Sequence, residues 1–163
     1  MTKMEVKKKT PSPGRAKKRA PPAIVVDVRE KHPYFFKDTP TIRRWIPTGD
    51  YTLDGFDERI AIERKSPEDA YGSVGQSRDR FEREWGRLSQ LEYAAVVIEA
   101  TPESLYTDPP PYSSMHPNSV ISTYLAWSIK YGVPVYFAGN RGYGAAMTRR
   151  LLHYWWKYKV EGA

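Results

Sequence analysis

Two carboxylates and a lysine stand out in the middle of this 163-residue sequence as groups able to do chemistry together. Asp50 follows a glycine, and the run 60–65 (IAIERK) carries Glu63 and Lys65 two residues apart. The run predicts a short strand, in which Glu63 and Lys65 share one face and Arg64 points to the other. Such acids suit Mg²⁺ binding in a nuclease, with Lys65 orienting or deprotonating the attacking water. Alternatively, Lys65 only neutralises the local carboxylates.

The spacing also predicts how the two acids meet. Short apolar segments flank a polar connection at 54–59 and indicate a β-hairpin. If Leu53 pairs with Ile60, Asp50 lies directly opposite Glu63, with Cβ atoms roughly 4.5–5.5 Å apart. Two carboxylates at that separation repel each other unless a cation lies between them. This register therefore predicts a metal site between the two strands.

The order of these residues resembles a known signature. Gly-Asp-Tyr at 49–51, a strand ending in Glu-Arg-Lys at 63–65, and Asp69 resemble the GD–ERK–D signature of XPF-type nuclease domains. The resemblance covers about residues 24–158. It implies an α/β, restriction-endonuclease-like fold, with a mixed central sheet flanked by helices, in a domain that we assign to 24–163.

The same resemblance implies an activity and a set of site residues. The activity is Mg²⁺- or Mn²⁺-dependent cleavage of DNA, at branched, flap or junction structures. Asp50 and Glu63 bind the metal, the backbone carbonyl of Arg64 is a further ligand, and Lys65 positions or activates the water. All-oxygen ligation with open positions suits Mg²⁺ rather than zinc.

A second acidic group follows the strand predicted at 24–28. Asp27, Arg29 and Glu30 stand at its end, in an order that resembles the opening motif of the same family. The resemblance makes Asp27 a further metal ligand and lets Glu30 order water or a second metal. We also assign Arg29 to DNA binding. A salt bridge among the three residues at the strand end is the alternative.

Two predicted helices follow the Glu-Arg-Lys stretch. Ser66 and a proline after it predict a helix start, where Asp69 stabilises the N-terminus in any protein; the resemblance alternatively places the last acid of the motif there. A longer helix is expected at 77–92. Its charged face resembles the solvated face of an ordinary surface helix, although the resemblance makes Arg78 and Arg80 candidate DNA contacts.

The excess positive charge lies in the first 23 residues. They carry eight Lys and Arg residues against one Glu, which equals the net charge of +7 of the whole chain. Their lack of large apolar side chains predicts a disordered basic tail at 1–23. Lys17, Lys18 and Arg19 are candidate phosphate contacts, and the cluster alternatively acts as a nuclear-import signal or a solubilising tail.

Other features set the expected context. The sequence has no cysteine, which excludes disulfides and thiolate zinc sites, and no stretch approaches the ~20 apolar residues of a membrane span. We expect a cytoplasmic or nucleoid-associated protein in a prokaryotic or viral host and a nuclear one in a eukaryote. The last helix, predicted at 144–159, packs on the core or forms a homodimer or heterodimer, with Trp156 the candidate to protrude.

Two functions compete with the nuclease assignment. An XPF-type fold without its chemistry is a DNA-docking partner, but the intact Asp50, Glu63 and Lys65 argue against that function. A nucleic-acid-binding protein that acts through its basic tail leaves unexplained why acids gather at the predicted strand ends of a net-neutral domain.

Overall fold

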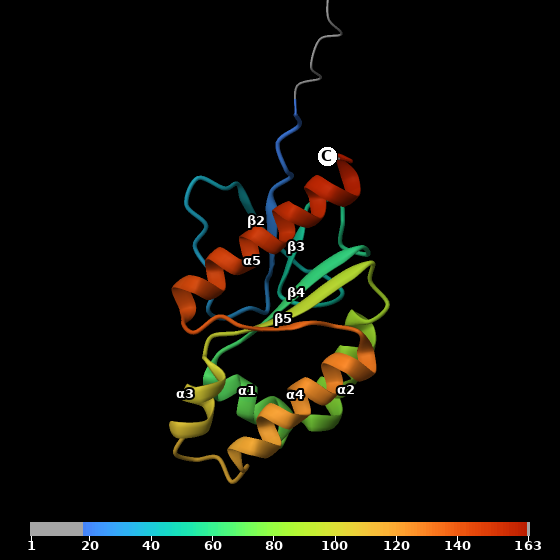
Figure 1. Cartoon of the computed structure of the whole chain (residues 1–163). Coiled ribbons are helices and arrows are strands. Elements are labelled where there is room, and N and C mark those ends of the chain that lie inside the picture. The colour runs from blue at the N-terminus through green and yellow to red at the C-terminus, as the bar shows by residue number, and fades with distance from the viewer. Residues whose placement is uncertain (1–17, 163) are drawn as a thin grey trace, which may run out of the picture.

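A mixed six-stranded sheet forms the centre of the molecule (Figure 1). The computed structural model describes residues 18–162. The spatial order of the strands is β2-β1-β3-β4-β5-β6, and β3 runs antiparallel to both of its neighbours while the other pairs are parallel. The strands are β1 (Ile24–Asp27), β2 (Thr41–Arg44), β3 (Tyr51–Leu53), β4 (Ile60–Lys65), β5 (Tyr93–Ile98) and β6 (Val135–Phe137).

Helices cover both faces of the sheet. In Figure 1, α5 crosses one face, and α1, α2 and α4 lie against the other. The helices are α1 (Pro67–Val74), α2 (Arg78–Leu88), α3 (Pro102–Thr107), α4 (Pro117–Tyr131) and α5 (Arg141–Trp155), the last continued by a π-helical turn, Trp156–Val160. This arrangement confirms the predicted α/β fold. Within residues 18–162, no helix is long and apolar enough to span a membrane.

Strand alternation distributes the core between the two faces. On β5, Val96 and Ile98 pack in the cluster formed with α1, α2 and α4, whereas Ala95 and Val97 pack in the cluster formed with α5. The same alternation on β4 places Ala61 in the first cluster and Ile62 in the second. Because Glu63 and Lys65 lie an even number of residues from Ala61, they face α1 and α2, and Arg64 faces α5.

The predicted hairpin register is confirmed. Tyr51 pairs with Ile62, which is the register expected from Leu53 opposite Ile60. Beyond the last paired residues, the Asp50 N–H donates to the Ile62 carbonyl at 2.9 Å. This bond is offset by one residue from the Tyr51–Ile62 register, so the regular ladder ends at Tyr51 and Asp50 lies beside the peptide that joins Ile62 and Glu63.

Two predicted details are wrong. Trp156 does not protrude, because it is only 6% exposed and packs in the core cluster beside α5. Helix α2 ends at Leu88, before the predicted end at residue 92. The N-cap of α4 is His116, whose ring Nδ1 accepts a hydrogen bond from the Asn118 N–H. Dimerisation through the C-terminal helices stays a prediction.

Candidate active site

A glycine turn brings Asp50 to the end of β4. Gly49 has a φ of 75°, and a Cβ at this position would lie 2.9 Å from the Ala61 Cβ and 3.2 Å from the Ile62 carbonyl oxygen. Only glycine therefore fits without strain. The turn leaves Asp50 Oδ2 accepting a hydrogen bond from the Arg64 N–H at 2.7 Å. That bond fixes the carboxylate against the backbone between Glu63 and Lys65.

These groups line a polar cavity of about 250 Å³ between the sheet and α2. The cavity brings together six of the predicted site residues: Asp27, Arg29, Asp50, Glu63, Lys65 and Arg80. Glu63 Oε1 lies 2.8 Å from Lys65 Nζ, and that ammonium lies 4.3 Å from the centroid of the Phe81 ring. Strand β4 and helix α2 thus face each other across the cavity.

Burial in the cavity raises the pKa of both Asp50 and Glu63. Burial, followed by the nearby charge of Glu63, raises the pKa of Asp50 well above its usual value, against the opposing hydrogen bond from the Arg64 N–H. Burial likewise raises the pKa of Glu63 although Lys65 opposes this. For Lys65, burial lowers the pKa, but Glu63 and then Asp50 outweigh burial and the net pKa is raised. Lys65 is therefore held as an ammonium ion.

The Asp27 carboxylate is already engaged in hydrogen bonds with neighbouring residues. Its two carboxylate oxygens accept four hydrogen bonds: three from Arg29, through the backbone N–H, Nε and Nη2, and one from the Ile46 N–H. Burial alone would raise the pKa of Asp27, but these bonds outweigh burial and lower it. The strand-end salt bridge considered for this motif is thus present between Asp27 and Arg29, on the wall of the cavity.

The carboxylate oxygens of the cavity fit a divalent cation that is bound mainly by two acids. Across residues 18–162, no three Asp, Glu or His side chains are grouped closely enough to hold a metal ion together. Asp50 and Glu63 nevertheless line the same polar cavity, and the charge of Glu63 raises the pKa of Asp50. A cation between them would relieve this repulsion. The predicted roles of Asp27 and of the Arg64 carbonyl as further ligands stay predictions.

Helix α2 contributes an acid that the sequence analysis missed. Glu84 Oε1 accepts a hydrogen bond from the Gly49 N–H at 3.0 Å, and its other oxygen pairs with Arg87. Arg80, Glu84 and Arg87 recur at i, i+4 and i+7 and line the cavity. This polar stripe lies beside the buried stripe that begins at Phe81, so the helix face assigned to solvent is in part a wall of the site. The i, i+4, i+7 spacing of Arg80, Glu84 and Arg87 was the sequence signal that could have identified this face as part of the site.

Comparison with protein families assigns the chain that carries this cavity to a known family. The family model described as ERCC4 domain matches residues 26–151, which contain the whole cavity. The chain belongs to the ERCC4 domain family. This match confirms the resemblance to XPF-type nuclease domains that the sequence motif predicted. No curated protein matched the chain.

Solved structures show the same fold. XPF from Aeropyrum pernix is similar with a TM-score of 0.64 and 22% identity, over 80% of this chain and 60% of that one. XPF from Aeropyrum pernix in complex with DNA is similar with a TM-score of 0.61 and 21% identity, over 85% of this chain and 66% of that one. The ERCC4 chain thus spans about two thirds or less of the solved chains.

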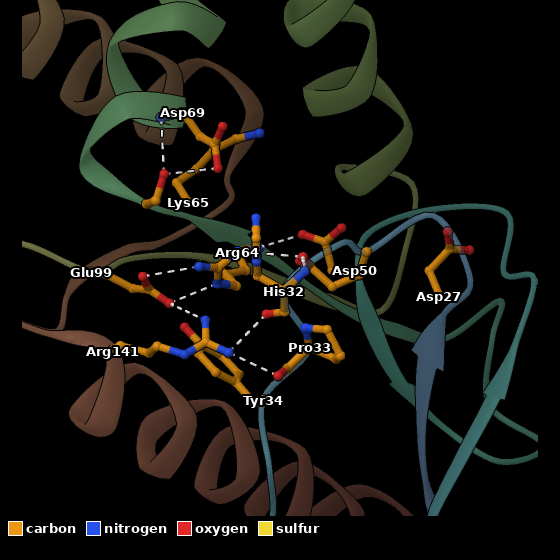
Figure 2. A network of polar contacts seen from close by, with 12 residues as sticks. Asp27, His32, Pro33, Tyr34, Asp50, Arg64, Lys65, Asp69, Glu99 and Arg141 are labelled. Atoms are coloured by element: carbon orange, nitrogen blue, oxygen red, sulfur yellow. Dashed lines mark hydrogen bonds and ion pairs between the residues drawn. The ribbon is translucent and has the colours of Figure 1, made fainter. Parts of the chain in front are cut away.

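The Arg64 side chain of this ERCC4 domain lies on the other face of the sheet (Figure 2). Its Nε and Nη2 donate to the two oxygens of Glu99 at 2.6 and 3.1 Å, and Nη1 lies 3.4 Å from Glu30 Oε1. Arg141 of α5 approaches Glu99 at 3.6 Å and donates to the carbonyls of His32 and Pro33. The structure therefore separates Glu30 and the Arg64 guanidinium from the cavity and joins β4, β5 and α5 through them.

Asp69 and Arg78 also make contacts away from the cavity. Asp69 donates its N–H to the hydroxyl of the N-cap Ser66, and its carboxylate accepts a hydrogen bond from that hydroxyl, so Asp69 holds the capping side chain of α1 in place. Arg78 donates to the carbonyl of Val74 and to the Thr123 hydroxyl. Of the two arginines predicted to contact DNA from α2, only Arg80 lines the cavity.

Part of the basic tail falls outside the described residues. Residues 1–17, including the predicted phosphate contact Lys17, lie there. The Arg19 N–H donates to the carboxylate of Glu161 near the C-terminus. Because Arg19 precedes β1 and Asp27 ends that strand, Arg19 lies beyond the opposite end of β1 from the cavity. The roles of Lys18 and Arg19 in DNA binding stay predictions.

Proposed function

We propose that this chain is a Mg²⁺- or Mn²⁺-dependent endonuclease that hydrolyses DNA phosphodiester bonds at branched, flap or junction structures. The observation that carries the proposal is that Asp50, Glu63 and the ammonium of Lys65 line one polar cavity, with Lys65 Nζ 2.8 Å from Glu63 Oε1. Membership of the ERCC4 domain family supports a nuclease, and the similar XPF in complex with DNA supports DNA as the ligand.

The residues divide into those that hold a cation and those that hold substrate. Asp50 and Glu63 supply the carboxylates for the metal, which when bound polarises the scissile phosphate and lowers the pKa of water. Lys65, kept protonated by its acidic neighbours, donates hydrogen bonds to the water or to a phosphate oxygen. Arg29 and Arg80 line the cavity and offer charge to the flanking phosphates.

Cleavage of flap, fork, four-way and linear DNA by site variants tests this proposal. With Mg²⁺ or Mn²⁺, we expect Asp50→Ala and Lys65→Ala each to lose about 100-fold or more of the cleavage rate. Asp54→Ala is the matched control, because Asp54 is an exposed acid at the far end of the same hairpin, paired only with Arg44.

The possible outcomes test the location of the site and the presence of the activity separately. Undiminished cleavage by both Asp50→Ala and Lys65→Ala would show that the site is elsewhere. DNA binding without cleavage by the unaltered chain would instead indicate a docking partner that lacks the chemistry. Equal losses in the Asp54→Ala control would trace the effect to the fold rather than to the cavity.

A further inference from the structure

Trp45 is the one tryptophan whose side chain faces solvent. All five tryptophans of the sequence lie within residues 18–162. Trp45 is 60% exposed, whereas the other four are at most 6% exposed. It directly follows β2, on the side of the sheet edge where β1 ends in Asp27. A large flat ring left open beside a polar cavity is a candidate contact for a ligand with an aromatic face.

The position of Trp45 is fixed to the cavity wall. The next residue, Ile46, donates its N–H to Asp27 Oδ2 at 2.8 Å and accepts a hydrogen bond from Arg29 Nη2 at 2.8 Å. Ile46 is itself fully buried. The backbone that carries the indole is therefore tied to two residues that line the cavity, so the ring is presented from a rigid element.

Arg29 lies beside the indole and keeps donors free. Its Cζ is 5.9 Å from the centroid of the Trp45 ring, and its side chain is 60% exposed. Nε and Nη2 are engaged by Asp27 and Ile46, whereas Nη1 donates no hydrogen bond to any part of residues 18–162. A guanidinium held by two of its nitrogens, with the third open to solvent, is suited to bind a phosphate oxygen.

We propose that Trp45 and Arg29 form a subsite for one unpaired nucleotide of DNA at the rim of the cavity. The base stacks on the indole, and its phosphate pairs with Arg29 Nη1. In a duplex both faces of each base are covered by neighbouring bases, so an exposed ring selects nucleotides that are unpaired. This inference rests on the proposed function and deepens it, because it names the residues that recognise the single-stranded part of a branched substrate.

Intrinsic fluorescence excited selectively at tryptophan tests the subsite directly, because Trp45 is the solvent-exposed tryptophan. The full chain in EDTA, where cleavage is prevented, is titrated with a duplex carrying a short single-stranded flap, with the same flap made of abasic sites, and with a blunt duplex. We expect the flap to quench the emission more than either control, and Trp45→Ala to abolish that difference. Trp45→Ala should weaken flap binding by roughly 5- to 150-fold, and Trp45→Phe by less.

Phe35→Ala is the matched control for loss of an exposed aromatic ring. Phe35 is 86% exposed and lies beside α5, on the other face of the sheet. We expect its flap affinity to stay within about twofold of the unaltered chain. Arg29→Ala is a poorer test, because that change also releases the Asp27 carboxylate.

Four results would overturn the inference. Equal quenching by the abasic flap would exclude base stacking, and equal weakening of flap and blunt duplex by Trp45→Ala would exclude selection for unpaired nucleotides. Absence of DNA binding by the unaltered chain would overturn both this inference and the proposed function. Binding and cleavage that ignore Trp45 would overturn the subsite alone and leave the nuclease proposal intact.

Discussion

The Glu99→Gln substitution should destabilise the fold by leaving the charge of Arg64 inadequately paired. Arg64 and Glu99 side chains are each 6% exposed and are joined by two hydrogen bonds of 2.6 and 3.1 Å. Burial alone lowers the pKa of Arg64, but the bonds to Glu99 outweigh burial and raise it, so the guanidinium is charged. The change to Gln keeps the volume of the side chain, removes the charge, and replaces one acceptor oxygen with an NH₂ donor that faces the donors of Arg64.

The expected loss follows from the cost of a buried, unpaired charge. Removing one partner of such a pair costs about 3–5 kcal/mol, against a total stability of roughly 5–15 kcal/mol for a domain. Glu30 at 3.4 Å and the Tyr34 ring at 5.5 Å remain near the guanidinium and place the loss near the lower end. A loss of about 3 kcal/mol lowers Tm by roughly 6–12 °C in a domain of this size.

Thermal and urea unfolding with a matched surface variant measure this effect. Glu82→Gln removes the same charge from an exposed pair with Lys130 and should leave Tm within about 2 °C. In the Glu99→Gln background, Arg64→Met should cost less than in the unaltered chain, because the charge that it removes is already unpaired. A Tm for Glu99→Gln within 2 °C of the unaltered chain, with Arg64→Met equally costly in both backgrounds, would refute the reasoning.

Further predictions concern the cavity. The raised pKa of Asp50 means that its contribution to the free energy of unfolding is present below its unfolded pKa of about 3.9 and is lost as pH rises through the folded pKa. Asp50→Asn should therefore be the more stable protein at neutral pH in EDTA, with the difference in urea unfolding shrinking toward pH 4. Saturating MgCl₂ should raise Tm of the unaltered chain but not of Asp50→Asn; equal shifts would contradict metal binding at Asp50. Glu84→Ala should slow cleavage by about 10–100-fold, and Glu84→Gln by less because its amide oxygen still accepts from the Gly49 N–H; identical rates for the two variants would exclude this role. Gly49→Ala should cost at least about 1–2 kcal/mol in urea unfolding from its positive φ alone, and an unchanged midpoint would show that the turn rearranges freely.

The sequence predicted those parts of the site that local periodicity determines. Alternation along β4 assigns Glu63 and Lys65 to one face and Arg64 to the other, whatever the rest of the fold. The short connection between β3 and β4 limits the possible registers, and a slip of one residue would move the apolar residues of β3 off the core. The position of Asp50 follows from that register, and Ser66 with the proline after it likewise marks the start of α1.

Contacts between distant segments were not predictable in the same way. Glu84 meets the Gly49 N–H, 35 residues away, and a charged helix face looks the same in sequence whether it meets solvent or a polar cavity. Arg78 and Arg80 differ by about 200° around α2, so one turns toward Thr123 and the other toward the cavity. Trp156 is buried because the chain continues past α5 in a π-helical turn that apolar spacing does not reveal.

The three residues of the Glu-Arg-Lys stretch act on opposite faces of one strand, and this changes how variants of Arg64 should be interpreted. The Arg64 backbone N–H holds the Asp50 carboxylate, while its side chain joins Glu99 on the face covered by α5. A substitution of the Arg64 side chain keeps the backbone bond but weakens the contacts that position β4. Lost cleavage in such a variant therefore indicates a positioning role, unless the variant retains both the stability of the unaltered chain and its affinity for DNA.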